Sequence, residues 1–256
     1  MKFISRKLAA LVGAFAMAAT GPFIMSAQAG VVISGTRVIF PGQAREVTVQ
    51  LTNAGESPAL IQTWIDKGDP NAPLDKIDVP FVLTPVVFRL DPTKGQTLRL
   101  IRTGESLAQD KESLFWLNVL EVPPKAKAGT EANRLQLAFR TRIKVMFRPP
   151  GLVGEAEAAP ALLRWEMVRD ADGKGPALRA NNPTPFVVNL GEVTLKSDGK
   201  AFAAGVGHVK PGDSALFPVH GLDSEVGGGA EVDYTSLNDW GGGVKNNQPL
   251  SAKAAR

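Results

Sequence analysis

The alternation of apolar and polar positions predicts β-strands along most of this chain. In the segment Glu46–Leu51, the residues Val47, Val49 and Leu51 lie two positions apart, which places their side chains on one face of a strand. Helical periodicity is weak, and 26 glycines and 19 prolines are scattered between short stretches of this kind. The pattern favours an all-β fold. The other expected strands are Val31–Ile33, Thr36–Phe40, Ala59–Ile65, Gln96–Ile101, Phe115–Val122, Leu162–Arg169, Phe186–Leu195 and Ala215–Val219.

The longest alternating stretch is Leu135–Phe147, which contains neither glycine nor proline. Leu135, Leu137, Phe139, Ile143, Val145 and Phe147 share one parity, and Gln136, Arg140, Arg142 and Lys144 share the other. As a single strand this stretch would be about 43 Å long at ~3.3 Å per residue, whereas strands usually have ~5–6 residues. One small sandwich cannot easily cover so long an apolar edge, so we expect another surface to cover the surplus.

A change of pattern follows this stretch directly. The sequence Arg148-Pro149-Pro150-Gly151 ends the alternation, and two prolines with a glycine after a long strand are typical of a domain boundary. The 256 residues are enough for two ordinary domains. We therefore expect one domain at 30–149 and a second at 150–245, followed by a loose polar tail at 246–256.

Residues 1–29 differ from the rest of the chain. Three basic residues near the start precede the apolar stretch Leu8–Ile24, and Ala27-Gln28-Ala29 fits the small-residue pattern of a cleavage site. These features are typical of a secretory signal peptide, and the mature chain would then begin at Gly30. The alternative is an uncleaved membrane anchor, which the break at Gly21-Pro22 disfavours. No later segment is long and apolar enough to span a bilayer, so no membrane insertion is expected after cleavage.

Charge and cysteine content exclude several classes of function. Three of the 29 basic residues and none of the 25 acidic ones lie in residues 1–29, so the formal charge of +4 falls to +1 for the rest of the chain. Nucleic-acid binding therefore loses its main electrostatic support. The chain has no cysteine, which excludes disulfides, thiol catalysis and cysteine-ligated metal sites.

Motifs of catalysis are also missing. The only histidines are His208 and His220, and neither has a partner at metal-site spacing. There is no G-x-S-x-G elbow, P-loop or dinucleotide fingerprint. Asp110 and Glu112 lie two apart, but paired carboxylates are common by chance and nothing else indicates a glycosidase. We therefore predict a protein that is not an enzyme and uses no metal or cofactor.

One segment carries a specific resemblance. Leu107–Pro124 reads L-A-Q-D-K-E-S-L-F-W-L-N-V-L-E-V-P-P, which resembles the signature of the pilus-assembly chaperones, the PapD-like family. Other segments on both sides of it are similar to the family and occur in the family's order, so the resemblance covers nearly all of the chain after residue 29. They are Thr36-Arg37, Thr84–Pro92, Thr141–Pro149, Asn182–Pro185 and Asn238–Gly242.

The resemblance implies a fold and a function. It implies two immunoglobulin-like β-sandwich domains in a boomerang arrangement. It also implies that the protein is located in the periplasm. The expected partners are pilin (fimbrial) subunits, which the chaperone binds, folds and caps by donor-strand complementation, and an outer-membrane usher that receives them. The surplus of the long strand would then be the working edge of the first domain. Such an edge is otherwise an aggregation hazard, and the free form could hide it by self-association.

The resemblance also implies roles for eight residues. Arg37 and Lys144 would bind the subunit's C-terminal carboxylate in the inter-domain cleft. A second group would fill the groove left by the subunit's missing strand, and a third would form a charged network that braces the two domains. The groove anchors are Leu135, Leu137 and Phe139, and the bracing residues are Glu112, Arg148 and Asp239.

Two other interpretations remain open at this point. A two-domain adhesion or structural module could use the same sandwiches, but it would not need the pair Arg37 and Lys144. A hydrolase with an unrecognised site would show turnover that one carboxylate or hydroxyl substitution abolishes. The sequence names neither the subunit nor the pilus that this chain serves.

Overall fold

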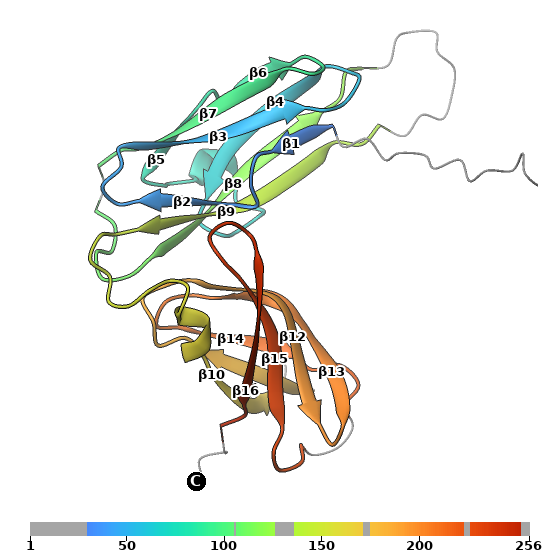
Figure 1. Ribbon diagram of the computed structural model, residues 1–256. Coiled ribbons are helices and arrows are strands. Elements are labelled where there is room, and N and C mark those ends of the chain that lie inside the picture. The colour runs from blue at the N-terminus through green and yellow to red at the C-terminus, as the bar shows by residue number, and fades with distance from the viewer. Residues whose placement is uncertain (1–29, 105, 126–135, 171–174, 223–225, 252–256) are drawn as a thin grey trace, which may run out of the picture.

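The computed structural model describes residues 30–104, 106–125, 136–170, 175–222 and 226–251. Among these residues there are strands and two short 3-10 helices but no α-helix. The strands form two β-sandwiches that follow each other along the chain and meet at an angle (Figure 1). The prediction of an all-β protein with two immunoglobulin-like domains is therefore confirmed.

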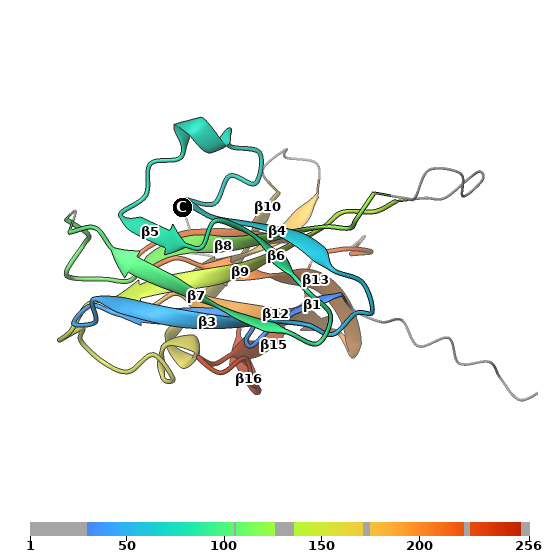
Figure 2. The same ribbon diagram turned by 90° about the horizontal axis from the view of Figure 1, so that it is seen from above.

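The first domain packs a sheet of four strands, in the order β1-β3-β7-β5, against a sheet of five, in the order β2-β9-β8-β4-β6. Seen from above, the strands of the two sheets run in roughly the same direction (Figure 2), as in aligned sandwiches. The elements are β1 Val31–Ile33, β2 Arg37–Pro41, β3 Glu46–Asn53, β4 Ala59–Asp66, η1 Leu74–Lys76, β5 Phe81–Thr84, β6 Val87–Leu90, β7 Gly95–Arg102, β8 Ser113–Val122 and β9 Phe139–Arg148.

The second domain packs the sheet β10-β11-β14 against the sheet β13-β12-β15-β16. Sequence analysis did not predict β11, β13 or β15, whose residues interrupt the apolar alternation with Gly, Ala, Asp or Ser. The elements are η2 Ala159–Leu162, β10 Arg164–Arg169, β11 Pro176–Asn181, β12 Val188–Ser197, β13 Lys200–Val209, β14 Ser214–Pro218, β15 Glu231–Leu237 and β16 Gly243–Pro249.

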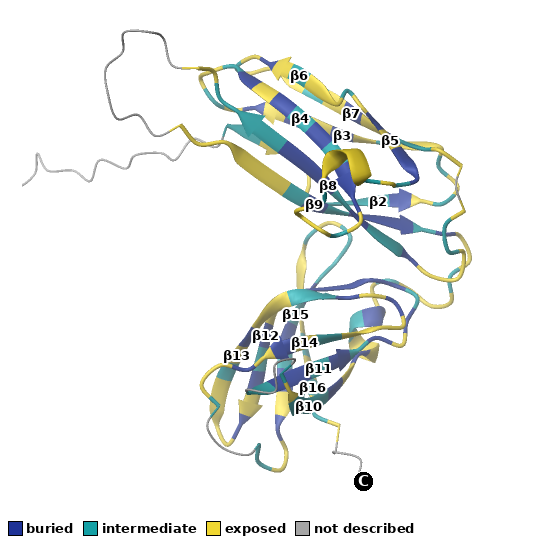
Figure 3. Ribbon diagram, turned by 180° about the vertical axis from the view of Figure 1, so that it is seen from behind, coloured by how far each residue is buried: buried dark blue, intermediate teal, exposed yellow. Residues whose placement is uncertain are grey.

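Each sandwich has a core of its own. In the first domain Phe40 packs against Phe81 and Phe147, and in the second Trp165 packs against Phe217 and Tyr234. Buried and exposed positions alternate along the strands of both domains (Figure 3). Because the apolar clusters are separate, each sandwich is stabilised by its own buried surface rather than by the other.

The predicted long strand is shorter in the structure. β9 begins at Phe139 rather than at Leu135, and residues 136–138 form no strand. The cause is its neighbour: Phe139 pairs with Glu121, and β8 ends at Val122 before Pro123-Pro124. Proline cannot donate to a ladder, so the chain before Phe139 has no strand beside it among the described residues. Leu135 lies outside the described residues.

The prediction of a loose polar tail from Asn246 is wrong for residues 246–249. They belong to β16, which pairs with β15 from Gly243 to Pro249. The polar side chains suit an edge strand with a solvated face, since Asn247 donates to Glu231 and Asp233 at 2.9 and 2.6 Å. The polar residues that suggested a loose tail are therefore the exposed and half-buried residues of an edge strand. The second domain extends beyond residue 245.

Candidate functional site

The N-terminal half of β9 has an open edge that leads toward the junction of the two domains (Figure 1). β8 pairs with β9 from Phe139 to Phe147, whereas β2 covers the opposite edge only from Lys144 onward. Within the described chain, residues 139–143 therefore have no strand on that second side. Such an edge presents unpaired backbone N–H and C=O groups to which another strand can be added.

Apolar side chains stand at this edge. Phe139 is 60% exposed and Leu137 is 51% exposed, although they share the parity of Ile143, which is buried in the core. The side chain of Gln136 donates to the carbonyl oxygens of Pro123 and Pro124 at 3.1 and 2.9 Å, which keeps this segment near the end of β8. Two large apolar groups are thus held in solvent beside unpaired backbone.

Two cations mark the place where the open edge ends. Arg37 and Lys144 lie side by side in the parallel ladder of β2 and β9. Arg37 donates from Nη1 to the carbonyl oxygen of Leu237 at 3.1 Å, while its buried Nε has no acceptor. Lys144 donates from Nζ to Asn189 Oδ1 at 2.7 Å. Neither cation forms a salt bridge with any described residue.

Burial works against both charges. It lowers the pKa of Arg37, and the charge of Asp239 only partly opposes this. Burial, followed by the charge of Arg37, lowers the pKa of Lys144 to about 8. Two neighbouring cations that are partly removed from water are costly without an anion. An added carboxylate would therefore be bound favourably by this pair.

Asn189 is a member of the site that sequence analysis missed. It lies on β12 of the second domain, is buried, and its Nδ2 lies 3.5 Å from the sulfur of Met146. The side chain thereby fixes Lys144 between the two domains. The available signal was a single polar residue inside the apolar run Phe186–Leu190, because a buried amide requires partners.

The structure brings Glu112, Arg148 and Asp239 together across the junction. Arg148 donates from Nε to Glu112 at 2.5 Å and from Nη1 and Nη2 to Asp239 at 2.7 and 2.9 Å. The other Glu112 oxygen accepts from the backbone N–H of Val187 at 2.7 Å. A bidentate pair and a carboxylate with a partner on each oxygen define one relative position of the two domains.

The electrostatics of this network favour the charged arginine. Burial acts to lower the pKa of Arg148, but hydrogen bonds and charges from Asp239 and Glu112 outweigh it and raise that pKa. Burial raises the pKa of Glu112 in spite of the hydrogen bonds from Val187 and Arg148. The arginine therefore stays ionised and compensates two carboxylates at once.

A second network, also missed, covers the outer face of β9. Asp66 is 1% exposed and accepts from Arg142 Nη2 at 2.7 and 2.9 Å. Asn118 Nδ2 donates to Asp66 at 2.7 Å, and Asn118 Oδ1 accepts from both Arg140 and Arg142. These contacts connect β9 with β8 and β4. The partners are far apart in sequence, so only the strand register reveals them.

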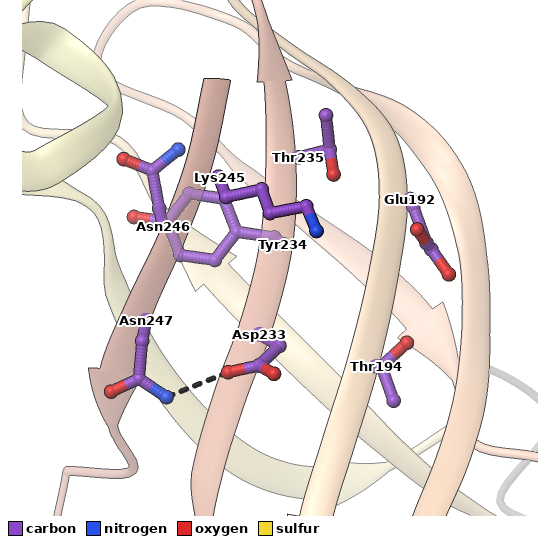
Figure 4. A pocket seen from close by; sticks show the side chains of 8 residues that line it. All are labelled: Glu192, Thr194, Asp233, Tyr234, Thr235, Lys245, Asn246 and Asn247. Carbon is purple, nitrogen blue, oxygen red and sulfur yellow. Dashed lines mark hydrogen bonds between the residues drawn. The ribbon is translucent and has the colours of Figure 1, made fainter. Parts of the chain in front are cut away.

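The rest of the described surface offers no comparable site. A shallow depression on the second domain holds Asp233 hydrogen-bonded to Asn247 (Figure 4). Its lining residues are Glu192, Thr194, Asp233, Tyr234, Thr235, Lys245, Asn246 and Asn247, none of which belongs to the junction. The described residues contain no cluster of three potential metal ligands. No helix among them has the length and apolar character to cross a membrane.

Comparison with known proteins identifies the family. Residues 30–153 match the family described as pili and flagellar-assembly chaperone, PapD N-terminal domain. Residues 158–248 match pili assembly chaperone PapD, C-terminal domain. The probable fimbrial chaperone YadV of Escherichia coli (strain K12) is 44% identical over 231 residues, covering 89% of this chain and 93% of YadV.

Solved structures agree with this result. The crystal structure of YadV has a TM-score of 0.74 at 40% identity and covers 87% of this chain and 100% of that one. A structure of the Salmonella enterica SafA pilin in complex with the SafB chaperone also matches, with a TM-score of 0.69 at 28% identity. The match covers 86% of this chain and 96% of the matched chain. Membership of a chaperone family implies a non-enzymatic role. The chain belongs to the PapD-like family and is a pilus-assembly chaperone.

Proposed function

We propose that this chaperone holds a pilus subunit in the periplasm by adding the open edge of β9 to it as a strand, and then passes it to an outer-membrane usher. The observation that carries the proposal is the position of Arg37 and Lys144 where the open edge ends. The leader at 1–29 supports export, and the complex of SafB with a pilin supports the kind of partner. Usher, compartment and residue roles are part of the proposal.

The register of β2 supports a carboxyl terminus as the ligand. β2 runs parallel to β9 and begins with Arg37 opposite Lys144. A partner strand on residues 139–143 would lie on the same line as β2, so its path is blocked where β2 begins. If that strand also runs parallel to β9, its last residue stops at Arg37. A chain that must end there presents its terminal carboxylate to the two cations.

The chemistry of the pair fits this ligand. The buried Nε of Arg37 has no acceptor, and a carboxylate can accept from Nε and a terminal nitrogen together. Lys144 supplies a point charge from the other side, positioned by Asn189. An anion here satisfies the orphaned donor and reduces the repulsion between the two cations. It also sets the register, because a slip of one residue would turn every side chain to the wrong face.

The exposed apolar residues supply the remaining binding energy. Phe139 and Leu137 are exposed and lie two residues apart, so they would share one face if the segment before Phe139 became a strand. Each would be worth roughly 1.5–3 kcal/mol when fully buried in a subunit. Leu135 is predicted to act in the same way one step further along. The segment before Phe139 would become a strand only when the subunit provides the ladder that β8 does not.

A comparison of free and amidated carboxyl ends tests the proposal. The probe is a pilin encoded beside the gene for this chain, together with synthetic peptides of its C-terminal segment that end in a carboxylate or an amide. We expect the amide to bind at least about 30-fold more weakly than the free acid, because it has no negative charge and only one acceptor oxygen to offer the two cations. Arg37→Ala and Lys144→Ala should lose affinity for the acid to the same degree.

Arg89→Ala is the matched control, since Arg89 is exposed and pairs with Asp91 on the surface. It should bind the free acid like the unchanged protein. Circular dichroism and unfolding midpoints of the two site variants should show intact folding, because each variant removes a partly buried cation. Equal binding of acid and amide, with both variants still active, would overturn the carboxylate mechanism.

A further inference from the structure

The turn between β15 and β16 is rigid. Asn238 accepts at Oδ1 from the backbone N–H groups of Trp240 and Gly242 at 3.1 and 2.8 Å. Its own N–H donates to the carbonyl oxygen of Gly242 at 2.9 Å, and its carbonyl oxygen accepts from Gly241 at 3.0 Å. Gly241 has a φ of +86°, which other residues rarely adopt. The turn therefore has one defined conformation.

This turn is also fixed against the first domain. The hairpin of β15 and β16 reaches from the second domain to the start of β2 (Figure 1). Asp239 binds Arg148, and a Cβ atom at Gly241 would come within 2.6 Å of Thr36 Oγ1. Thr36 directly precedes Arg37, so the turn lies at the entrance to the proposed carboxylate site.

Trp240 is the large apolar side chain of this turn, and it projects into solvent. It is 90% exposed, whereas Trp165 is 1% exposed. Trp64 and Trp116 are half-buried beneath the cationic side chains of β9. A tryptophan held in solvent by a rigid turn loses little conformational freedom on binding, and such residues frequently dominate interface energetics.

We propose that Trp240 is a binding contact for the subunit, packing against apolar surface next to the subunit's carboxyl end. The inference rests on the proposed function, because the turn adjoins the site that would hold that carboxylate. This continuity favours the subunit over an usher or a second copy of the chain as occupant. Arg37 and Lys144 would then fix the charged end, while Trp240 packs on the neighbouring body of the subunit.

Fluorescence quenching by acrylamide tests the contact directly. The difference in quenching between the unchanged protein and Trp240→Phe isolates the signal of residue 240 from the other tryptophans. In the free protein this difference should be large, because Trp240 is exposed. In the purified complex with the neighbouring pilin it should largely disappear. If acrylamide still quenches the fluorescence of Trp240 fully in the complex, the inference is overturned and the carboxylate mechanism stays intact.

Affinity provides the second readout. Trp240→Ala should bind the pilin about 30-fold more weakly, chiefly through faster dissociation, with an unchanged unfolding midpoint. Val82 is an exposed apolar residue on β5, in the first-domain sheet that does not contain β9. Val82→Ala is therefore the matched control and should bind the pilin normally. A loss confined to assays that contain the usher, or protection of Trp240 in the free protein as its concentration rises, would assign another occupant. Failure of any pilin to bind the unchanged protein would contradict the proposed function itself.

Discussion

Lys144 is subject to two opposing requirements at the scale of a single residue. The proposed binding of a carboxylate requires its charge, but burial and the neighbouring Arg37 lower its pKa to about 8. A lysine whose pKa is lower in the folded than in the unfolded chain costs stability when it is protonated. The unfolded chain binds more protons between about pH 8 and about pH 10.5, so stability rises with pH across that window.

The lowered pKa of Lys144 predicts how subunit affinity depends on pH. Subunit affinity should be constant from about pH 6 to pH 7.5 and should fall by up to about tenfold per pH unit above pH 8, because free Lys144 loses its proton. Lys144→Arg stays charged and should show no such decline. The neighbouring His208, whose pKa burial and the charges of Lys144 and Lys210 lower to about 4, stays neutral throughout. Isothermal titration across this range is the measurement, and identical pH profiles for both proteins would contradict the assignment.

The sequence anticipated part of this site. Arg37 and Lys144 were predicted from motif resemblance, and the structure places them in one ladder pair. Asn189 and Asp66 were missed, because their significance arises from contacts with Met146, Lys144 and Arg142 that only folding creates. Local patterns identify which face of a strand is buried, whereas the partner of a buried polar group depends on pairing between distant strands.

At the scale of the element, β9 shows why strand boundaries escape prediction. The alternation of its side chains continues back to Leu135, yet the strand begins at Phe139. A strand extends only as far as a neighbour offers backbone partners, and β8 ends before two prolines. The tail was misjudged for the opposite reason: the polar residues of β16 had a partner in β15. The residues that the structure leaves without a partner are those proposed to join the subunit.

The second network predicts how firmly this element is held. Asp66→Ala would remove the buried carboxylate to which Arg142 and Asn118 donate, and we expect a loss of about 3 kcal/mol in the free energy of unfolding. Asp91→Ala removes an exposed ion pair with Arg89 and should cost less than about 1 kcal/mol. Urea titration followed by fluorescence compares the two. Equal, small losses would show that the network does not hold β9 to β8 and β4.

At the scale of the whole molecule, the two sandwiches have separate cores but would share the proposed binding site for the subunit. Arg37 and Lys144 come from the first domain, while Asn189 and Trp240 come from the second. A change of angle between the domains would separate these groups even if both sandwiches stayed folded. Arg148 bonds to Glu112 in the first domain and Asp239 in the second, so its contribution lies in geometry more than in net stability.

Arg148→Ala should therefore loosen the junction between the domains and weaken subunit binding while both cores stay folded. The variant leaves Glu112 buried beside Val187 without its cation, which we expect to cost about 3 kcal/mol locally. It also frees Asp239 and with it the turn that carries Trp240. Small-angle scattering should show a broader distribution of inter-domain distances, and pilin binding should weaken by about tenfold or more.

Arg179→Ala, which removes an exposed pair with Glu166, is the control and should change neither the scattering nor the binding. An unchanged scattering curve with weakened binding would instead place the effect of Arg148 in the site itself, and unchanged binding would show that the subunit alone sets the angle between the domains.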